Sequence, residues 1–170
     1  MRIKFAILTI SDRSSQGIRE DRSGPVLQQA VTDSGWEVCQ TGLIPDEYFE
    51  IIGRLRDWAD SGKYNVILTT GGTGFSPRDI TPEATKEVLD RSAPGLAEAM
   101  RQGSLTITPH AMLSRAEAGI RKKTLIINLP GSPKGALENF RIIAPVLPHA
   151  IQILEDDSDA EKNHQRPLAA

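Results

Sequence analysis

Residues 3–10 read Ile-Lys-Phe-Ala-Ile-Leu-Thr-Ile, an almost uninterrupted apolar and β-branched run with the length of one strand. Runs of this kind are typical of strands that are buried on both faces of a parallel sheet. Similar runs recur at residues 65–70 and 124–129, and residues 36–44 form a weaker one that Gly42 interrupts. The sequence therefore predicts four strands of a mostly parallel sheet.

Apolar residues at helical spacing separate these runs. The clearest stripe extends from Tyr48 to Ala59 and places six apolar residues on one face. Shorter stripes lie at residues 26–31, 84–89, 96–100, 137–144 and 150–154. Ser23 and Thr81 are expected to be helix N-caps, and Pro82 suits a first helical position.

Strands that alternate with helices in this way predict right-handed crossovers. We therefore expect an α/β fold, a three-layer, doubly wound, mostly parallel sheet with helices on both faces. Residues 105–123 remain ambiguous, because residues 106–108 favour a strand, Pro109 interrupts it, and Gly119 suits either a hairpin turn or a bulge.

The composition is that of one globular domain. The 170 residues carry a net charge of −2, and the acidic segment 155–170 accounts for −3 of it, which leaves +1 on the rest. We expect one domain at residues 1–155 and a disordered tail at 156–170. A nearly neutral body argues against nucleic-acid or membrane partners, and without a hydrophobic leader or span we expect a cytoplasmic protein.

Three unusual loops follow predicted strands and precede predicted helices. The first covers residues 11–17 and continues to Asp-Arg-Ser-Gly-Pro at 21–25, the second is Thr-Thr-Gly-Gly-Thr-Gly at 69–74, and the third is Pro-Gly-Ser-Pro-Lys-Gly at 130–135. In parallel sheets the carboxyl ends of strands share one edge, where ligands bind. The sequence therefore predicts one site built from three distant segments.

The second loop has the composition of an anion-binding nest. Glycines at 71, 72 and 74 permit positive φ and let backbone N–H groups face a phosphate, although such a loop can also merely connect strand to helix. It is not a P-loop, because Phe75-Ser76 follows where Lys-Ser/Thr is required. Pro77 excludes a dinucleotide fingerprint, and Ser132 lacks the frame of a nucleophile elbow.

Two carboxylates stand at or beside this edge of the sheet. Asp46 follows the second strand, and Asp79 follows the glycine-rich loop. Such a pair beside bound phosphates suits Mg²⁺, which takes one or two carboxylates together with phosphate oxygens and waters. Asp46 is equally suited to capping the helix that begins near Tyr48, and Asp79 can form an Asx-turn instead.

Other candidate groups are less informative. Arg78 and Lys134 can pair with phosphate oxygens or be solvated surface residues. The three histidines, at 110, 149 and 164, show no ligand spacing. Cys39 excludes an internal disulfide, since it is the only cysteine, and we expect it to be packed within its strand.

The combined motifs resemble those of the molybdopterin adenylyltransferases, the family of MogA/MoaB-type proteins and of the gephyrin G domain. The matching strings are LTISD at 8–12, DRSGP at 21–25, PDE at 45–47, TTGGTG at 69–74 with PRD at 77–79, LSR at 113–115 and INLPGS at 127–132. The resemblance covers residues 3–154. One departure from some members is Ser132-Pro133-Lys134.

The resemblance implies a homotrimeric enzyme of molybdenum cofactor biosynthesis. Such an enzyme transfers AMP from ATP to the terminal phosphate of molybdopterin with the help of Mg²⁺, releases pyrophosphate, and passes its product to a molybdate-insertion partner protein. It also implies catalytic and metal-binding roles for Asp46 and Asp79. The residues expected to contact substrate are Ser11, Asp12, Gly71, Gly72, Thr73, Gly74, Ser114, Arg115, Pro130, Gly131, Ser132 and Lys134.

The chemistry of these residue types agrees with this activity. Transfer at phosphorus needs alignment and charge neutralisation more than covalent help, and a phosphate nucleophile is already anionic near neutral pH. Two alternatives remain: a non-catalytic pterin-binding or scaffold protein of the same family, and a nucleotide-hydrolysing relative.

Overall fold

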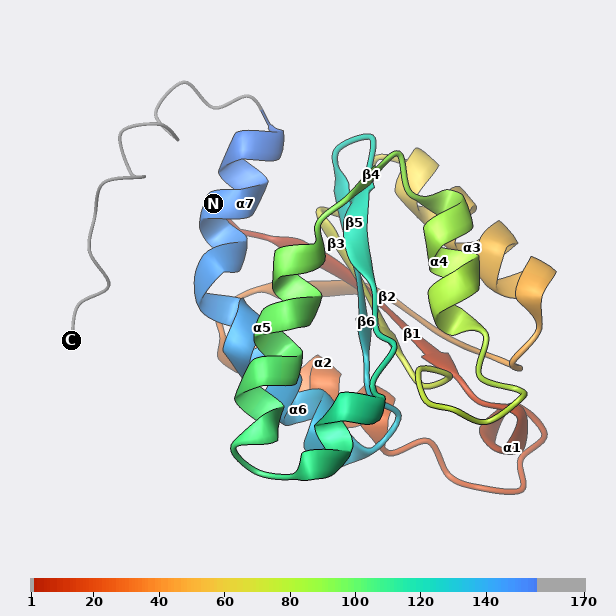
Figure 1. The fold of residues 1–170 in the computed structure, drawn as a ribbon. Helices are drawn as coiled ribbons and strands as arrows, with labels where there is room; N and C mark the ends of the chain where they lie inside the picture. Colours follow the sequence, from red (N-terminus) through yellow and green to blue (C-terminus); the bar gives the residue numbers. More distant parts are fainter. Residues whose placement is uncertain (1, 156–170) are drawn as a thin grey trace.

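The computed structural model describes residues 2–155, so the tail predicted at 156–170 lies outside the described residues. One six-stranded sheet has the order β2-β1-β3-β6-β5-β4 (Figure 1). The strands are β1 (Lys4–Ile10), β2 (Glu37–Ile44), β3 (Val66–Thr70), β4 (Arg91–Ser92), β5 (Ala118–Arg121) and β6 (Thr124–Leu129). The four predicted strands are confirmed, each to within one residue at either end.

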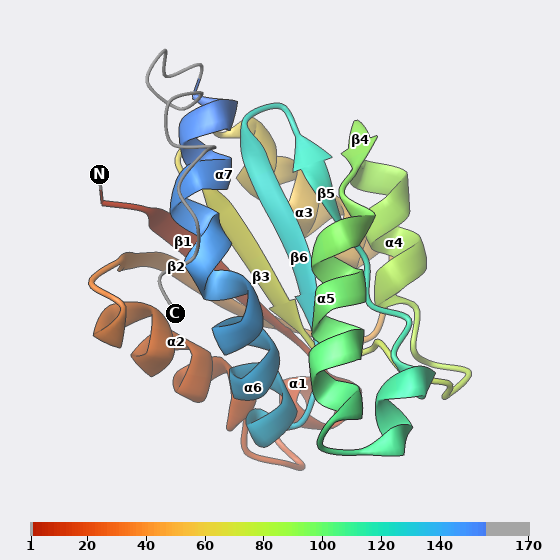
Figure 2. The same ribbon diagram turned by 60° about the vertical axis from the view of Figure 1, so that its left-hand side comes forward.

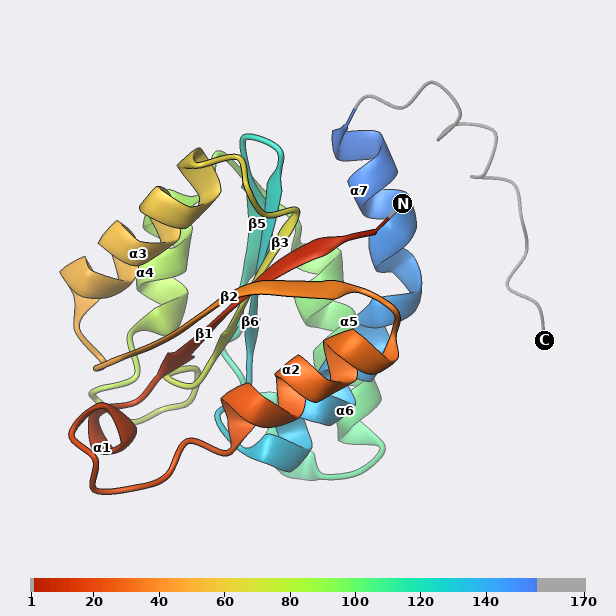
Figure 3. The same ribbon diagram turned by 180° about the vertical axis from the view of Figure 1, so that it is seen from behind.

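Helices cover both faces of the sheet. One face carries α2 (Ser23–Asp33), α5 (Pro94–Leu105), α6 (Pro133–Ile143) and α7 (Leu147–Leu154), and the other carries α3 (Tyr48–Asp60) and α4 (Thr81–Val88) (Figures 2 and 3). The remaining turns are α1 (Asp12–Ser15) and the 3₁₀ helices η1 (Pro109–Leu113) and η2 (Ala144–Val146). The predicted doubly wound α/β fold with helices on both faces is confirmed.

The apolar strands supply two separate cores. Phe5 and Ile7 of β1 face α2 and α6, whereas Ala6 and Leu8 face α3 and α4. Because successive side chains of a strand point to opposite faces, a strand between two helical layers is buried at nearly every position and is therefore mostly apolar. Burial of each large side chain is worth roughly 1.5–3 kcal/mol, so both layers contribute strongly to the sheet's stability.

Several local predictions were wrong. Ser23 and Thr81 are not N-caps but the first residues of α2 and α4, and the Asp21 carboxylate accepts from the N–H of Gly24 instead. Residues 106–108 are not a strand. Cys39 is exposed rather than packed, because β2 is an edge strand.

The short strands β4 and β5 were not predicted. Gly119 is neither a hairpin turn nor a bulge: it pairs with Ser92 and Ile126, and a Cβ there would meet the backbone of Arg91 at 2.5 Å. The hairpin between β5 and β6 turns at Lys122, whose φ is 52°. These antiparallel strands extend the sheet from β6, the last of its four parallel strands.

The topology places a switch point at the centre of the sheet. β1 is parallel to β2 on one side and to β3 on the other. The helix α2 that follows β1 covers one face of the sheet, and the helix α4 that follows β3 covers the other face. In such sheets ligands bind beyond the carboxyl ends of the strands at this crevice. Among residues 2–155, no helix combines the length and the apolar character needed to cross a bilayer.

Candidate active site

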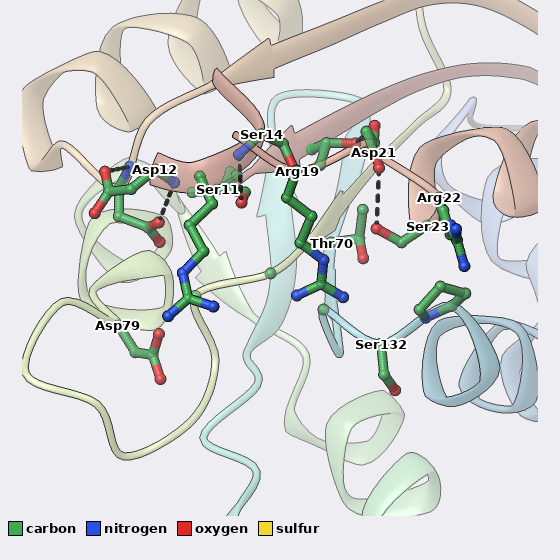
Figure 4. Close-up of a pocket in the computed structure, with 18 of the residues that line it drawn as sticks. Ser11, Asp12, Ser14, Arg19, Asp21, Arg22, Ser23, Thr70, Asp79 and Ser132 are labelled. Atoms are coloured by element: carbon green, nitrogen blue, oxygen red, sulfur yellow. Dashed lines mark hydrogen bonds between the residues drawn. The ribbon is translucent and has the colours of Figure 1, made fainter. Parts of the chain in front are cut away.

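A cavity of about 460 Å³ opens at the switch point (Figure 4). Its walls come from the segments that follow β1, β2, β3 and β6, and they include Asp12, Asp46, Gly72 and Gly131. The volume is in the range of small-molecule sites. The three loops predicted to meet at one edge of the sheet do meet there.

Asp12 and Asp46 bind one another's backbone. The N–H of Asp12 donates to Oδ2 of Asp46 at 2.9 Å, and the N–H of Asp46 donates to Oδ1 of Asp12 at 3.0 Å. This reciprocal pair joins the loop after β1 to the loop after β2. It fixes two carboxylates side by side, although their charges repel.

Arg78 offsets part of this repulsion. Its guanidinium binds both oxygens of Asp12, with Nε–Oδ2 at 3.0 Å and Nη2–Oδ1 at 3.1 Å, and it also reaches Glu47 at 2.6 Å. These hydrogen bonds hold the pKa of Asp12 below its ordinary value and raise the pKa of Arg78. Arg78 therefore serves as a bridge between loops in this structure.

Asp46 is less well compensated. Its residue is 8% exposed, and its Oδ1 atom has no hydrogen-bond partner. Burial raises its pKa, and the charges of Asp12 and Asp79 add to this effect while the hydrogen bond from Asp12 opposes it. Asp46 is not the N-cap of α3: that position is Glu47, whose side chain makes no capping bond. The Oδ1 atom of Asp46 is therefore available to a ligand.

Gly71 and Gly72 shape the floor of the cavity. Their φ angles are 107° and 66°, and a side chain on Gly71 would overlap the carbonyl oxygen of Ile10. A Cβ on Gly72 would lie 2.8 Å from Oδ1 of Asp46 and against the hydroxyl of Thr81, which also lacks a partner. Gly74 does not adopt positive φ, contrary to expectation; a Cβ there would meet Oδ2 of Asp79 at 2.9 Å.

A second cavity of about 430 Å³ adjoins the first. It shares Gly72, Asp79, Gly131 and Ser132 with it and extends toward α5 and η1. Asp79 thus lies on the wall common to both, with its carboxylate accepting from the N–H of Ser76 at 3.1 Å. Two adjoining cavities that share one carboxylate can hold two ligands with their reacting groups together.

Most of the predicted substrate-binding residues line one cavity or both. Ser11, Asp12, Gly71, Gly72, Gly131 and Ser132 line the first, and Thr73, Gly74, Ser114 and Pro130 line the second. Arg115 and Lys134 line neither of these two. The Lys134 side chain is 80% exposed and its nearest ion-pair partner is Glu138, at 3.8 Å.

The sequence interpretation did not single out Arg19. In Figure 4 its side chain extends from the segment between α1 and α2 into the first cavity. Arg19 lies in an irregular segment without periodicity, so only its position between two matching motifs, 8–12 and 21–25, could have drawn attention to it. Arg13, in α1, lines the same cavity; it lies in the first predicted loop but was not itself named as a candidate.

The charges of the first cavity leave room for a cation. Five acids line it (Asp12, Glu20, Asp21, Asp46 and Asp79) against four arginines (Arg13, Arg19, Arg22 and Arg78). Within residues 2–155, no three or more His, Cys, Asp or Glu side chains form a complete metal site. Asp46, with its unpartnered Oδ1, and Asp79 fit the partial oxygen set that Mg²⁺ uses beside phosphates.

The switch-point cavity, its glycine-lined floor and its carboxylates together form a candidate site for a phosphorylated small molecule. The chain belongs to a family whose model, described as "Probable molybdopterin binding domain", matches residues 6–149. The sheet and the two cavities both fall almost entirely within that span.

Named relatives agree with this assignment. A molybdopterin adenylyltransferase of Escherichia coli K12 is 41% identical over 169 residues, covering 90% of this chain and 86% of that protein. A gephyrin of Dictyostelium discoideum is 48% identical over 158 residues, 87% of this chain but only 22% of the gephyrin. The chain likewise spans 27% of the Drosophila melanogaster molybdenum cofactor synthesis protein cinnamon.

Solved structures extend the likeness to three dimensions. The molybdopterin biosynthesis enzyme MoaB of Thermus thermophilus has a TM-score of 0.86 and 48% identity, covering 91% of this chain and 98% of MoaB. A MogA structure has a TM-score of 0.84 and 38% identity, covering 89% of this chain and 99% of MogA.

Proposed function

We propose that the protein is a molybdopterin adenylyltransferase of molybdenum cofactor biosynthesis. In this reaction an oxygen of the terminal phosphate of molybdopterin forms a bond to the α-phosphorus of ATP. The bond from that phosphorus to the oxygen bridging the β-phosphate breaks, and pyrophosphate leaves with the electron pair. The products are adenylylated molybdopterin and pyrophosphate.

The observation that carries this proposal is the common wall of the two cavities. A transfer between two phosphate-bearing substrates needs adjoining sites, and Asp79, Gly72, Gly131 and Ser132 belong to both. Holding the reacting groups close together in a fixed orientation supplies much of the rate enhancement in such reactions. Named relatives that this chain covers at 71–88% of their length carry the name molybdopterin adenylyltransferase.

Residues of this chain supply the remaining requirements. The N–H of Gly71 donates to the carbonyl of Leu129 at 3.2 Å, which leaves the N–H of Gly72 to orient phosphate oxygens, and Arg19 adds a guanidinium that can bind them in a fork. Asp46 and Asp79 would hold Mg²⁺, which when bound neutralises charge that develops on the phosphates. No dedicated base is needed, because the attacking phosphate is already ionised near pH 7.

Further properties belong to the same proposal. We propose a homotrimer, a cytoplasmic location and hand-over of the product to a molybdate-insertion partner. The support for them is the family to which the chain belongs, and size-exclusion chromatography with light scattering tests the trimer.

The direct test is pyrophosphate release from ATP by the purified protein. We expect release that requires both molybdopterin and Mg²⁺ and that stops when either is left out. Calorimetry with each substrate separates the alternatives: binding of pterin without binding of ATP would support a scaffold. Pyrophosphate or phosphate released without pterin would support a nucleotide hydrolase.

A further inference from the structure

Arg115 binds the segment beside the cavities through both its side chain and its backbone. Its Nε donates to the carbonyl of Gly74 at 2.7 Å, and its Nη2 donates to the carbonyl of Asp79 at 2.6 Å. Its Nη1 pairs with Glu83 of α4, and its own backbone N–H donates to the carbonyl of Thr73 at 2.9 Å. One residue thus binds the 73–79 loop at three separate carbonyls.

The loop contains no helix or strand, and its internal bonds join Ser76 to Asp79 and Ser76 to Arg78. The bridge from Arg78 to Asp12 and Glu47 holds it on the side of the first cavity. The carbonyls of Gly74 and Asp79 lie at the two ends of the exposed turn, and the guanidinium of Arg115 spans them. Such a planar fork imposes direction on its acceptors, which the single ammonium of a lysine does not.

The same contacts argue against a substrate-binding role for Arg115. Its guanidinium lies on the outer side of the loop, beside Phe75, Ile80 and Glu83, and it borders neither of the two adjoining cavities at the switch point. Each of its three nitrogens already has an acceptor within the protein. Three of its five N–H donors are therefore used within the protein.

We propose that Arg115 is a positioning residue that sets the location of Asp79 on the wall between the two cavities. It acts through the 73–79 loop and touches no substrate. The effect on the reaction rests on the proposed function, because it assumes that Asp79 takes part in adenylyl transfer. Displacing a reacting or aligning group by about 1 Å can cost about 100-fold in rate.

The kinetic test compares Arg115→Lys with Arg115→Gln. Since the role depends on the fork and not on the charge, we expect kcat to fall at least about tenfold in both variants while KM for ATP and for molybdopterin stays within about twofold. A lysine variant with wild-type kcat, or a rise in either KM at unchanged kcat, would overturn the proposal and indicate direct phosphate binding.

Arg121 provides a matched control. Its guanidinium also joins a carboxylate and a carbonyl, binding Asp60 at 2.8 Å and the carbonyl of Val88 at 3.0 Å, but it lies at the other end of the sheet. We expect Arg121→Lys to lower stability without changing kcat. If Arg121→Lys lowers kcat as much as Arg115→Lys does, general destabilisation explains the result and the proposal fails.

Hydrogen–deuterium exchange tests the loop without any assay of activity. We expect the amides of the 73–79 loop to exchange at least about tenfold faster in Arg115→Lys, and to be unchanged in Arg121→Lys. Glu83→Gln removes only the ion pair and should give an intermediate increase in a protein that stays folded. If exchange of the loop amides is unchanged in both Arg115→Lys and Glu83→Gln, the proposal is contradicted, even if the protein proves not to be an adenylyltransferase. Conversely, faster exchange in a protein without pyrophosphate release would refute only the proposed function.

Discussion

The two ends of the parallel strands differ in how completely their carboxylates are paired within the protein. At the amino end of β6, Arg121 binds both carboxylate oxygens of Asp60 at 2.8 Å, and Lys122 adds a second cation at 3.1 Å. These contacts lower the pKa of Asp60 to about 2. At the carboxyl end, Asp46 keeps an unpartnered oxygen and its pKa is raised by burial.

The difference indicates which end has a structural role and which end binds ligands. Asp60, which joins a helix to a strand, is paired with cations of the protein. A carboxylate that binds a ligand keeps an oxygen available for that ligand, as Asp46 does. Perturbed groups in a cleft are candidates for function on this ground. Four substitutions test this difference between the two ends.

Removing the charge shared by the two cavities should have the largest effect. We expect Asp79→Asn to reduce pyrophosphate release by about 100- to 1000-fold, equivalent to about 3–4 kcal/mol of barrier, with the thermal midpoint little changed. The same substitution at Asp60, at the amino end of the parallel strands, serves as the control and should leave turnover intact. An Asp79→Asn protein with normal turnover would remove Asp79 from the reaction.

The next largest effect is expected for Gly71, on the floor of the first cavity. Gly71→Ala combines a φ of 107° with an overlap on the carbonyl of Ile10. We expect a loss of about 3 kcal/mol or more in the free energy of unfolding, measured in urea. Gly62→Ala has φ 66° but no neighbour within 4 Å, and should lose only about 1–2 kcal/mol. Equal losses would show that the close approach at Gly71 is unimportant.

Neutralising the uncompensated carboxylate should separate stability from activity. In Asp46→Asn the amide oxygen can still accept from Asp12, and the amide nitrogen can face the unpartnered hydroxyl of Thr81. We expect the free energy of unfolding at pH 7 to rise by about 1 kcal/mol while adenylyl transfer falls. A less stable variant would mean that the buried charge is satisfied in solution.

The smallest effect is expected for the stability of an Asp60→Asn variant, at the amino end of the parallel strands. Because the folded-state pKa of Asp60 is about 2 and its reference value is 3.8, its ion pairs stabilise the protein fully above that reference value. This contribution is lost as the pH falls from 3.8 toward 2. We therefore expect the stability difference between wild type and Asp60→Asn to vanish over that range in denaturant titrations. A difference that stays constant down to about pH 2 would contradict the assignment.

The fold could be predicted from sequence where each segment has one dominant pattern. β1, β3 and β6 are buried at nearly every position because two helical layers cover them, and their mostly apolar, β-branched runs are typical of such strands. β4 and β5 have only two and four residues, and their pairing depends on contacts distant in sequence. Local patterns do not encode such pairing, which explains why residues 105–123 stayed ambiguous.

The site was predictable in its location but not in its internal pairing. The three loops could be placed because parallel strands end at one edge. Their side-chain partners could not, since Asp12–Asp46 and Arg115–Asp79 join segments 34 and 36 residues apart. For the same reason Asp46 was indistinguishable from a helix cap, and Arg115 from a phosphate ligand.

A crystal structure with ATP and Mg²⁺ would show whether the switch-point cavity is the active site. We predict that the triphosphate lies in the cavity bordered by Asp12, Gly72 and Gly131, with the metal bound by Asp46 and Asp79. A nucleotide bound elsewhere, or a metal that contacts neither carboxylate, would contradict the account.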